Sequence, residues 1–74
     1  MSKEIHLQGY GRVQATEAEN LKIGSKLIWN FGETSKVIDI TPKGKKQLTI
    51  TEEYKTGVHS RVVSRTRLIG FISL

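Results

Sequence analysis

The chain of 74 residues contains no cysteine and only one proline, Pro42. Without cysteine, neither a disulfide nor a thiolate-bound zinc ion supplements the small core that a chain of this length buries. No apolar run approaches the roughly 20 residues of a membrane-spanning helix, and no apolar segment typical of a signal peptide begins the chain. We therefore expect one soluble domain over residues 1–74, a cytoplasmic location and no membrane partner.

Residue combinations that perform catalysis or bind metals are also missing. His6 and His59 are the only histidines, and neither has a second histidine or a carboxylate pair at a spacing typical of a metal site. The serines lack a base and a third orienting group. The segment Gly9-Tyr10-Gly11-Arg12 lacks the third glycine and the long following helix of a phosphate-binding loop, so it indicates a bend in a strand. We expect no enzymatic activity, no metal and no cofactor.

Short segments rich in β-branched residues, separated by glycines and Pro42, predict an all-β fold. We expect strands over residues 4–13 (with the bend at 9–11), 26–31, 36–41, 46–54, 60–68 and 69–74. Thr16 and Glu19 have the spacing of a capping box and predict one short helical turn near residues 16–20. These elements indicate a small barrel or antiparallel meander of five to six strands.

Five aromatic residues divide into expected core and expected surface positions. Leu27, Trp29 and Phe31 share one face of the strand expected over 26–31, so we expect both aromatic rings to be buried. A loop is expected to follow at 30–35. Tyr10 lies between glycines and Tyr54 lies beside a turn, which makes them surface candidates for stacking on nucleic-acid bases.

The segment Leu21-Lys22-Ile23-Gly24-Ser25-Lys26-Leu27-Ile28-Trp29 follows the expected helical turn. Its leucine, its glycine and its alternating strand with an aromatic residue resemble the opening of many SH3-like barrels. The segment Trp29-Asn30-Phe31-Gly32 is also similar to short uncharacterised proteins that bacteriophages and prophages encode. The resemblance covers residues 15–71. It implies a small SH3-like barrel and a mobile-element origin, and it assigns no binding residue.

The chain has a net charge of +5, and its cations are concentrated in its second half. Residues 43–67 include seven Lys and Arg residues against two acids, Glu52 and Glu53. Three arginines share one face of the strand expected over 60–68, beside the lysines of a turn, and arginine is well suited to phosphate. Alternatively, these cations only keep the domain soluble and pair with Glu33, Glu52 or Glu53. The candidate nucleic-acid-binding residues are Lys43, Lys45, Lys46, Arg61, Arg65 and Arg67.

The sequence thus predicts a non-catalytic binding domain whose basic sheet face contacts the phosphate backbone of nucleic acid without reading its sequence. The alternative is a protein-binding accessory or modulator module, phage-encoded and acting on a host protein. Such a module would use the aromatic loop at 29–35 or an exposed edge strand. Because edge strands of small barrels often pair between subunits, both a monomer and a dimer remain open.

Overall fold

The computed structural model of the protein describes residues 3–74 and confirms the all-β fold. Its strands and 3-10 helices are β1 (Lys3–Leu7), β2 (Gly11–Glu17), η1 (Ala18–Asn20), β3 (Lys26–Ile28), η2 (Asn30–Gly32), β4 (Thr34–Lys43), β5 (Gln47–Tyr54), β6 (Gly57–Ser64) and β7 (Leu68–Ser73). The strand count exceeds the expected five to six because the segment 4–13 divides into β1 and the start of β2. Across residues 3–74, no helix has the length and apolar character needed to span a bilayer.

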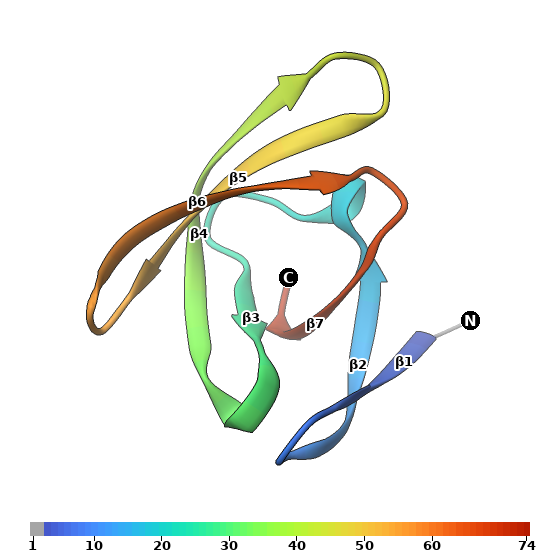
Figure 1. Cartoon of the computed structure of the whole chain (residues 1–74), viewed down its shortest axis with the longest axis vertical. Coiled ribbons are helices and arrows are strands. Elements are labelled where there is room, and N and C mark those ends of the chain that lie inside the picture. Colours follow the sequence, from blue (N-terminus) through green and yellow to red (C-terminus); the bar gives the residue numbers. More distant parts are fainter. Residues whose placement is uncertain (1–2) are drawn as a thin grey trace.

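The seven strands form one antiparallel sheet in the order β1-β2-β7-β3-β4-β5-β6. Hairpins join β1 to β2, β4 to β5 and β5 to β6, whereas the C-terminal β7 returns to lie between β2 and β3. Figure 1 shows that the sheet curls, with the β4–β5 turn at one end of the molecule and the β1–β2 turn at the other. Strands β1 and β6 are the two edges of the sheet.

The core consists of the inward side of the curled sheet, including Leu27, Val37 and Ile69. In β5, Leu48, Ile50 and Glu52 are buried, whereas the residues between them are partly or fully exposed. This alternation follows from the period of two along a strand. The same period that buries two aliphatic residues therefore also brings a carboxylate into the core.

The predicted capping box does not form. Thr16 and Glu17 are the last residues of β2, where Thr16 still pairs with Ile69 of β7. The helical turn η1 begins only at Ala18 and has no side-chain cap. The Thr16 hydroxyl instead accepts a hydrogen bond from Nδ2 of Asn20 at 3.2 Å. Extended backbone at Thr16 thus rules out the N-cap geometry that the spacing predicted.

The strand expected over 26–31 ends at Ile28, so the predicted burial of Phe31 is wrong. Phe31 lies in η2 with a φ of 64° and a ψ of 17°, which is left-handed backbone. This turn directs its side chain outward, and 71% of the residue is exposed. Trp29 precedes the turn and remains partly buried against the core, as expected.

The strand expected over 60–68 is also shorter, because β6 ends at Ser64 and residues 65–67 form the connection to β7. Arg61, Arg65 and Arg67 therefore do not project from one strand face, as the sequence had predicted. Val63 is only 3% exposed, which shows that the β6 face shared by Arg61 and Val63 is the inner one. The three arginines occupy three different environments.

Candidate nucleic-acid interface

The turn between β4 and β5 gathers four of the six candidate cations. Lys43 ends β4, and Lys45 and Lys46 lie in the turn, where Gly44 adopts a φ of +68°. Arg65 joins them from the β6–β7 connection. Its backbone N–H donates to the carbonyl oxygen of Lys46 at 3.0 Å, and its Nε donates to the carbonyl oxygen of Lys45 at 3.0 Å. We call Lys43, Lys45, Lys46 and Arg65 the hairpin cluster.

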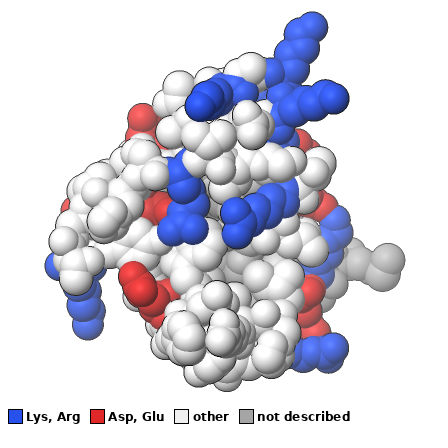
Figure 2. Space-filling model, in the orientation of Figure 1, with Lys and Arg blue, Asp and Glu red and all other residues white. Residues whose placement is uncertain are grey.

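In the described part of the chain, no acid forms an ion pair with the hairpin cluster, and the acid that contacts it is Glu19, whose backbone N–H donates to the carbonyl oxygen of Arg65 at 3.0 Å. The shallow depression beside it is lined by Lys43, Gly44, Lys45, Lys46, Gln47 and Ser64. The ion pairs found within residues 3–74 involve other cations, namely Lys3–Glu17, Arg12–Glu4 and Arg61–Glu52. Figure 2 shows Lys and Arg side chains at the end of the molecule where the β4–β5 hairpin lies, and again in the middle of that face. Positive side chains held together in this way attract polyanions.

A hollow of about 450 Å³ lies between β1, η2, β6 and the start of β7. The two remaining candidate cations, Arg61 and Arg67, both line it. Arg67 is an exposed residue of the connection before β7, and its side chain makes no ion pair within residues 3–74. We call this feature the central hollow; its lining residues are Ile5, His6, Leu7, Trp29, Asn30, Phe31, Glu33, Tyr54, Arg61, Arg67, Leu68 and Ile69.

Glu52, which is 0% exposed, accepts hydrogen bonds from four side chains. Its Oε1 accepts from Nε1 of Trp29 at 2.9 Å, from Oγ of Ser35 at 2.8 Å and from the hydroxyl of Tyr54 at 3.2 Å. Its Oε2 accepts from Nε of Arg61 at 2.7 Å. These bonds offset the cost of removing a carboxylate from water. We call these five residues the Glu52 network.

Arg61 is the central cation of this network. Its guanidinium carbon lies 3.9 Å from the centroid of the Trp29 ring, and its Nη2 donates to the Tyr54 hydroxyl at 2.7 Å. Its charge is paired with Glu52, although 36% of its side chain remains exposed. The prediction of Arg61 as a free cation on a wet sheet face is therefore wrong. The side chain faces inward and links β6 to β5.

Two exposed aromatic residues lie where the β1–β2 turn meets η2. Tyr10 is exposed, as expected, and each ring packs on a glycine of the opposite turn: Phe31 on Gly9 and Tyr10 on Gly32. A side chain at either glycine would overlap with the ring. The Phe31 N–H also donates to the carbonyl oxygen of Gln8 at 2.7 Å. Left-handed backbone is unusual for a bulky residue, and such strained positions are concentrated at functional sites.

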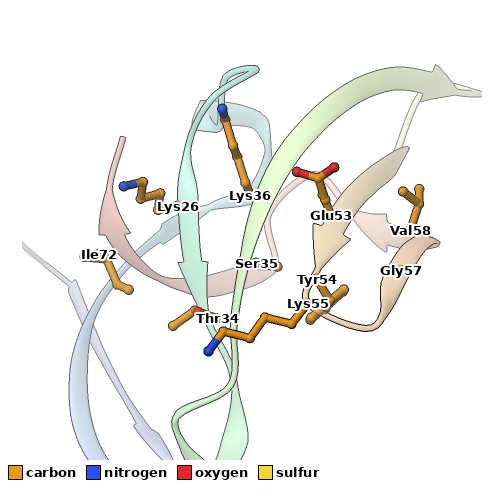
Figure 3. A pocket seen from close by; sticks show the side chains of 10 residues that line it. All are labelled: Lys26, Thr34, Ser35, Lys36, Glu53, Tyr54, Lys55, Gly57, Val58 and Ile72. Atoms are coloured by element: carbon orange, nitrogen blue, oxygen red, sulfur yellow. The ribbon is translucent and has the colours of Figure 1, made fainter.

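A depression of about 640 Å³ is an open groove lined by residues of β3, β4, β5, β6 and β7. Figure 3 shows that Lys26, Lys36 and Lys55 point in different directions around it, with Ile72 and Val58 on opposite sides. Because its charged side chains do not converge on one point, this groove does not indicate a phosphate or catalytic site.

The burial of Glu52 is absent from the sequence prediction, which treats this residue only as a surface partner for the arginines. A signal is present in the sequence, because Glu52 is in phase with Leu48 and Ile50 along one strand. An acid in phase with core residues indicates a buried carboxylate that needs partners. No comparable signal exists for the packing of Phe31 on Gly9, which joins segments that are distant in the sequence.

We expect Glu52→Gln to lower the free energy of unfolding by about 3 kcal/mol, because Arg61 then loses its only charged partner in the network. This expected loss is at the lower end of those seen when a buried ion pair is broken, because Arg61 is partly exposed. Urea denaturation measures it. Glu53→Gln is the matched control on the exposed side of β5, and we expect a change within about 0.5 kcal/mol. Equal effects of the two substitutions would contradict the role of Glu52.

Burial, and then the negative charge of Glu52, raise the pKa of Tyr54 above its ordinary value of 10.0. The folded protein therefore holds this proton more tightly than the unfolded chain does. The resulting stabilisation is complete below pH 10.0 and is lost as the pH rises through the folded-state pKa. We expect the melting temperature above pH 10.0 to fall more steeply for the wild type than for Tyr54→Phe. Thermal unfolding between about pH 8 and about pH 11.5 tests this. The control is Tyr10→Phe, which removes an exposed hydroxyl; its melting temperature should fall with pH as steeply as that of the wild type.

Comparison with protein-family models, with curated proteins and with solved structures finds no match for this chain. Its function is therefore inferred from the hairpin cluster, the central hollow and the Glu52 network.

Proposed function

We propose that this protein is a non-catalytic domain that binds the phosphate backbone of nucleic acid through the hairpin cluster. The supporting observation is the docking of Arg65 on the carbonyl oxygens of Lys45 and Lys46, which collects four cations that form no ion pair within residues 3–74. Two hydrogen bonds hold Arg65 in place against the repulsion of the neighbouring lysines. Arginine and lysine side chains supply most of the charged contacts that proteins make with phosphate.

The net charge of +5 adds long-range attraction to a polyanion. The hairpin cluster consists of lysines at a turn and one arginine, which contact phosphates in any sequence. We therefore propose binding without sequence-specific readout. Arg67 is a further contact at the edge of the central hollow, whereas Arg61 supports the fold through Glu52. A cytoplasmic location, an SH3-like barrel and a phage origin remain parts of the proposal that rest on the sequence alone.

The double substitution Lys43→Glu with Lys45→Glu tests the hairpin cluster. We expect it to weaken binding to a random-sequence DNA duplex at least about tenfold and to reduce the salt slope by about 1.8, at ~0.9 for each lost phosphate contact. The control pairs Lys22→Glu with Lys55→Glu, which lowers the net charge from +5 to +1 in the same way. Fluorescence anisotropy between about 50 and about 200 mM salt measures both quantities.

Two outcomes of this experiment would overturn the proposal. No binding of the wild-type protein to DNA or RNA at about 50 mM salt, where backbone contacts are strongest, would exclude nucleic acid as a partner. Equal losses in the two double variants would show that only overall charge matters, and that the hairpin cluster is not a site.

A protein-binding module is the second candidate, and the free edge of β6 favours it. Strand β6 ends the sheet order, and its outer edge pairs with no other strand of residues 3–74. Val58 and Val62 on this strand are exposed. An extended segment of a partner can add a strand at such an edge, and a second copy of the chain can do the same.

The edge is tested by capture from a nuclease-treated bacterial lysate. We expect one stoichiometric protein partner that resists high salt with the wild type and is lost when Val58→Lys and Val62→Lys are combined. Ile23→Lys is the control, because Ile23 is also an exposed aliphatic residue but lies outside β6. A captured protein that the edge variant still retains would rule out β6 as its binding site.

A further inference from the structure

We propose that the central hollow receives one unpaired nucleotide of a single strand, with the base against the Phe31 ring and the phosphate at Arg67. This deepens the proposed function and rests on it, because the hairpin cluster supplies the neighbouring phosphate contacts. It also implies a preference for single strands over duplexes, since a base enters a protein hollow only when it is unpaired.

The size and lining of the central hollow suit such a ligand. Its volume of about 450 Å³ lies within the range of about 300–1,000 Å³ that is usual for sites of small organic ligands. Half of its lining residues are apolar, such as Ile5 and Phe31, and the other half are polar or charged, including His6, Asn30 and Arg67. A lining of this mixed kind suits a ligand that is flat and apolar on its faces and polar at its edges, because the polar groups fix the orientation of the ligand.

Phe31 supplies the surface on which a base stacks. It lines the central hollow and is 71% exposed, although one side of its ring rests on Gly9. The left-handed backbone and the hydrogen bond from Phe31 to Gln8 hold the ring in this position before any ligand arrives. A fixed exposed ring loses little freedom on binding, and stacking on it tolerates every base.

Arg67 supplies the cation for the phosphate. It is exposed, lines the central hollow and makes no ion pair with any residue of the described range 3–74. It is two positions from Arg65, and two residues span at most about 7 Å. One strand can therefore contact the hairpin cluster with one phosphate and Arg67 with another nearby.

Other ligands fit the central hollow less well. An organic cation would be repelled by Arg61 and Arg67, which both line the hollow, and the guanidinium of Arg61 already covers the Trp29 face at 3.9 Å. Glu33 also lines the hollow and repels a phosphate. Removing the charge of Glu33 is therefore expected to strengthen the binding of a nucleotide and to weaken the binding of a cation. The direction of the change in affinity thus distinguishes the two kinds of ligand.

The experiment uses mixed-sequence single strands of about eight nucleotides, as DNA and as RNA. The same DNA sequence as a duplex and a nucleoside monophosphate are the comparison ligands. Trp29 is the only tryptophan and lines the central hollow, so its fluorescence reports occupancy there. We expect the single strands to quench it and to bind more tightly than either comparison ligand.

The variants separate stacking from charge and from folding. Phe31→Leu keeps apolar bulk but removes the ring, and we expect single-strand binding to weaken about fivefold or more while duplex binding stays unchanged. Phe31→Tyr keeps the ring and should retain wild-type affinity. Arg67→Gln should reduce the salt slope for single strands by about 0.7, and Glu33→Gln should tighten binding. Thermal unfolding confirms that each variant is folded.

The results distinguish this inference from the function on which it rests. Equal affinity for single strand and duplex, with no effect of Phe31→Leu on either, would overturn the nucleotide site and leave the hairpin cluster as the interface. A monophosphate that binds as tightly as the strand would overturn the assignment to a strand. No binding of any nucleic acid would overturn the proposed function as well.

Discussion

The arrangement of this protein depends on satisfying one buried carboxylate. Glu52 lies fully buried in β5, where an uncompensated charge would cost several kcal/mol. Its partners come from three other places in the chain: Trp29 after β3, Ser35 in β4 and Arg61 in β6. A slip of one residue in the pairing of β5 would move the carboxylate to the opposite face. The Glu52 network therefore specifies the register of the strands that surround it.

The Glu52 network also distinguishes Arg61, which belongs to it, from Arg65 and Arg67, which do not, although the sequence carries no sign of this difference. Arg61 points inward, and its charge is used within the fold. Arg65 and Arg67 follow the end of β6, in the connection to β7, where Arg65 is partly exposed and Arg67 is exposed. Arg65 then joins the lysines of the β4–β5 turn through backbone carbonyl oxygens. The cations proposed for phosphate binding are thus residues at or beside turns rather than residues of one sheet face.

Local patterns predicted the parts of the structure that depend on local physics. The alternation of Leu48 and Ile50 marked a strand with one buried face, and Gly44 marked the turn that presents Lys43 and Lys45. Local patterns failed where distant contacts decide. Phe31 continues the alternation of Leu27 and Trp29 in the sequence. In the structure, however, its backbone is left-handed, and its exposed ring packs on Gly9 of the β1–β2 hairpin.

By itself, the sequence determined the all-β class, the excess of cations in the second half and the placing of three lysines around one turn. These properties follow from composition, from the period of two and from the backbone preferences of glycine, and all of them act over a few residues. Only the tertiary structure decided which arginine is paired and which is free, and which aromatic ring is exposed. Those outcomes depend on charge pairing and packing between residues such as Glu52 and Arg61, which the curled sheet brings together from separate strands.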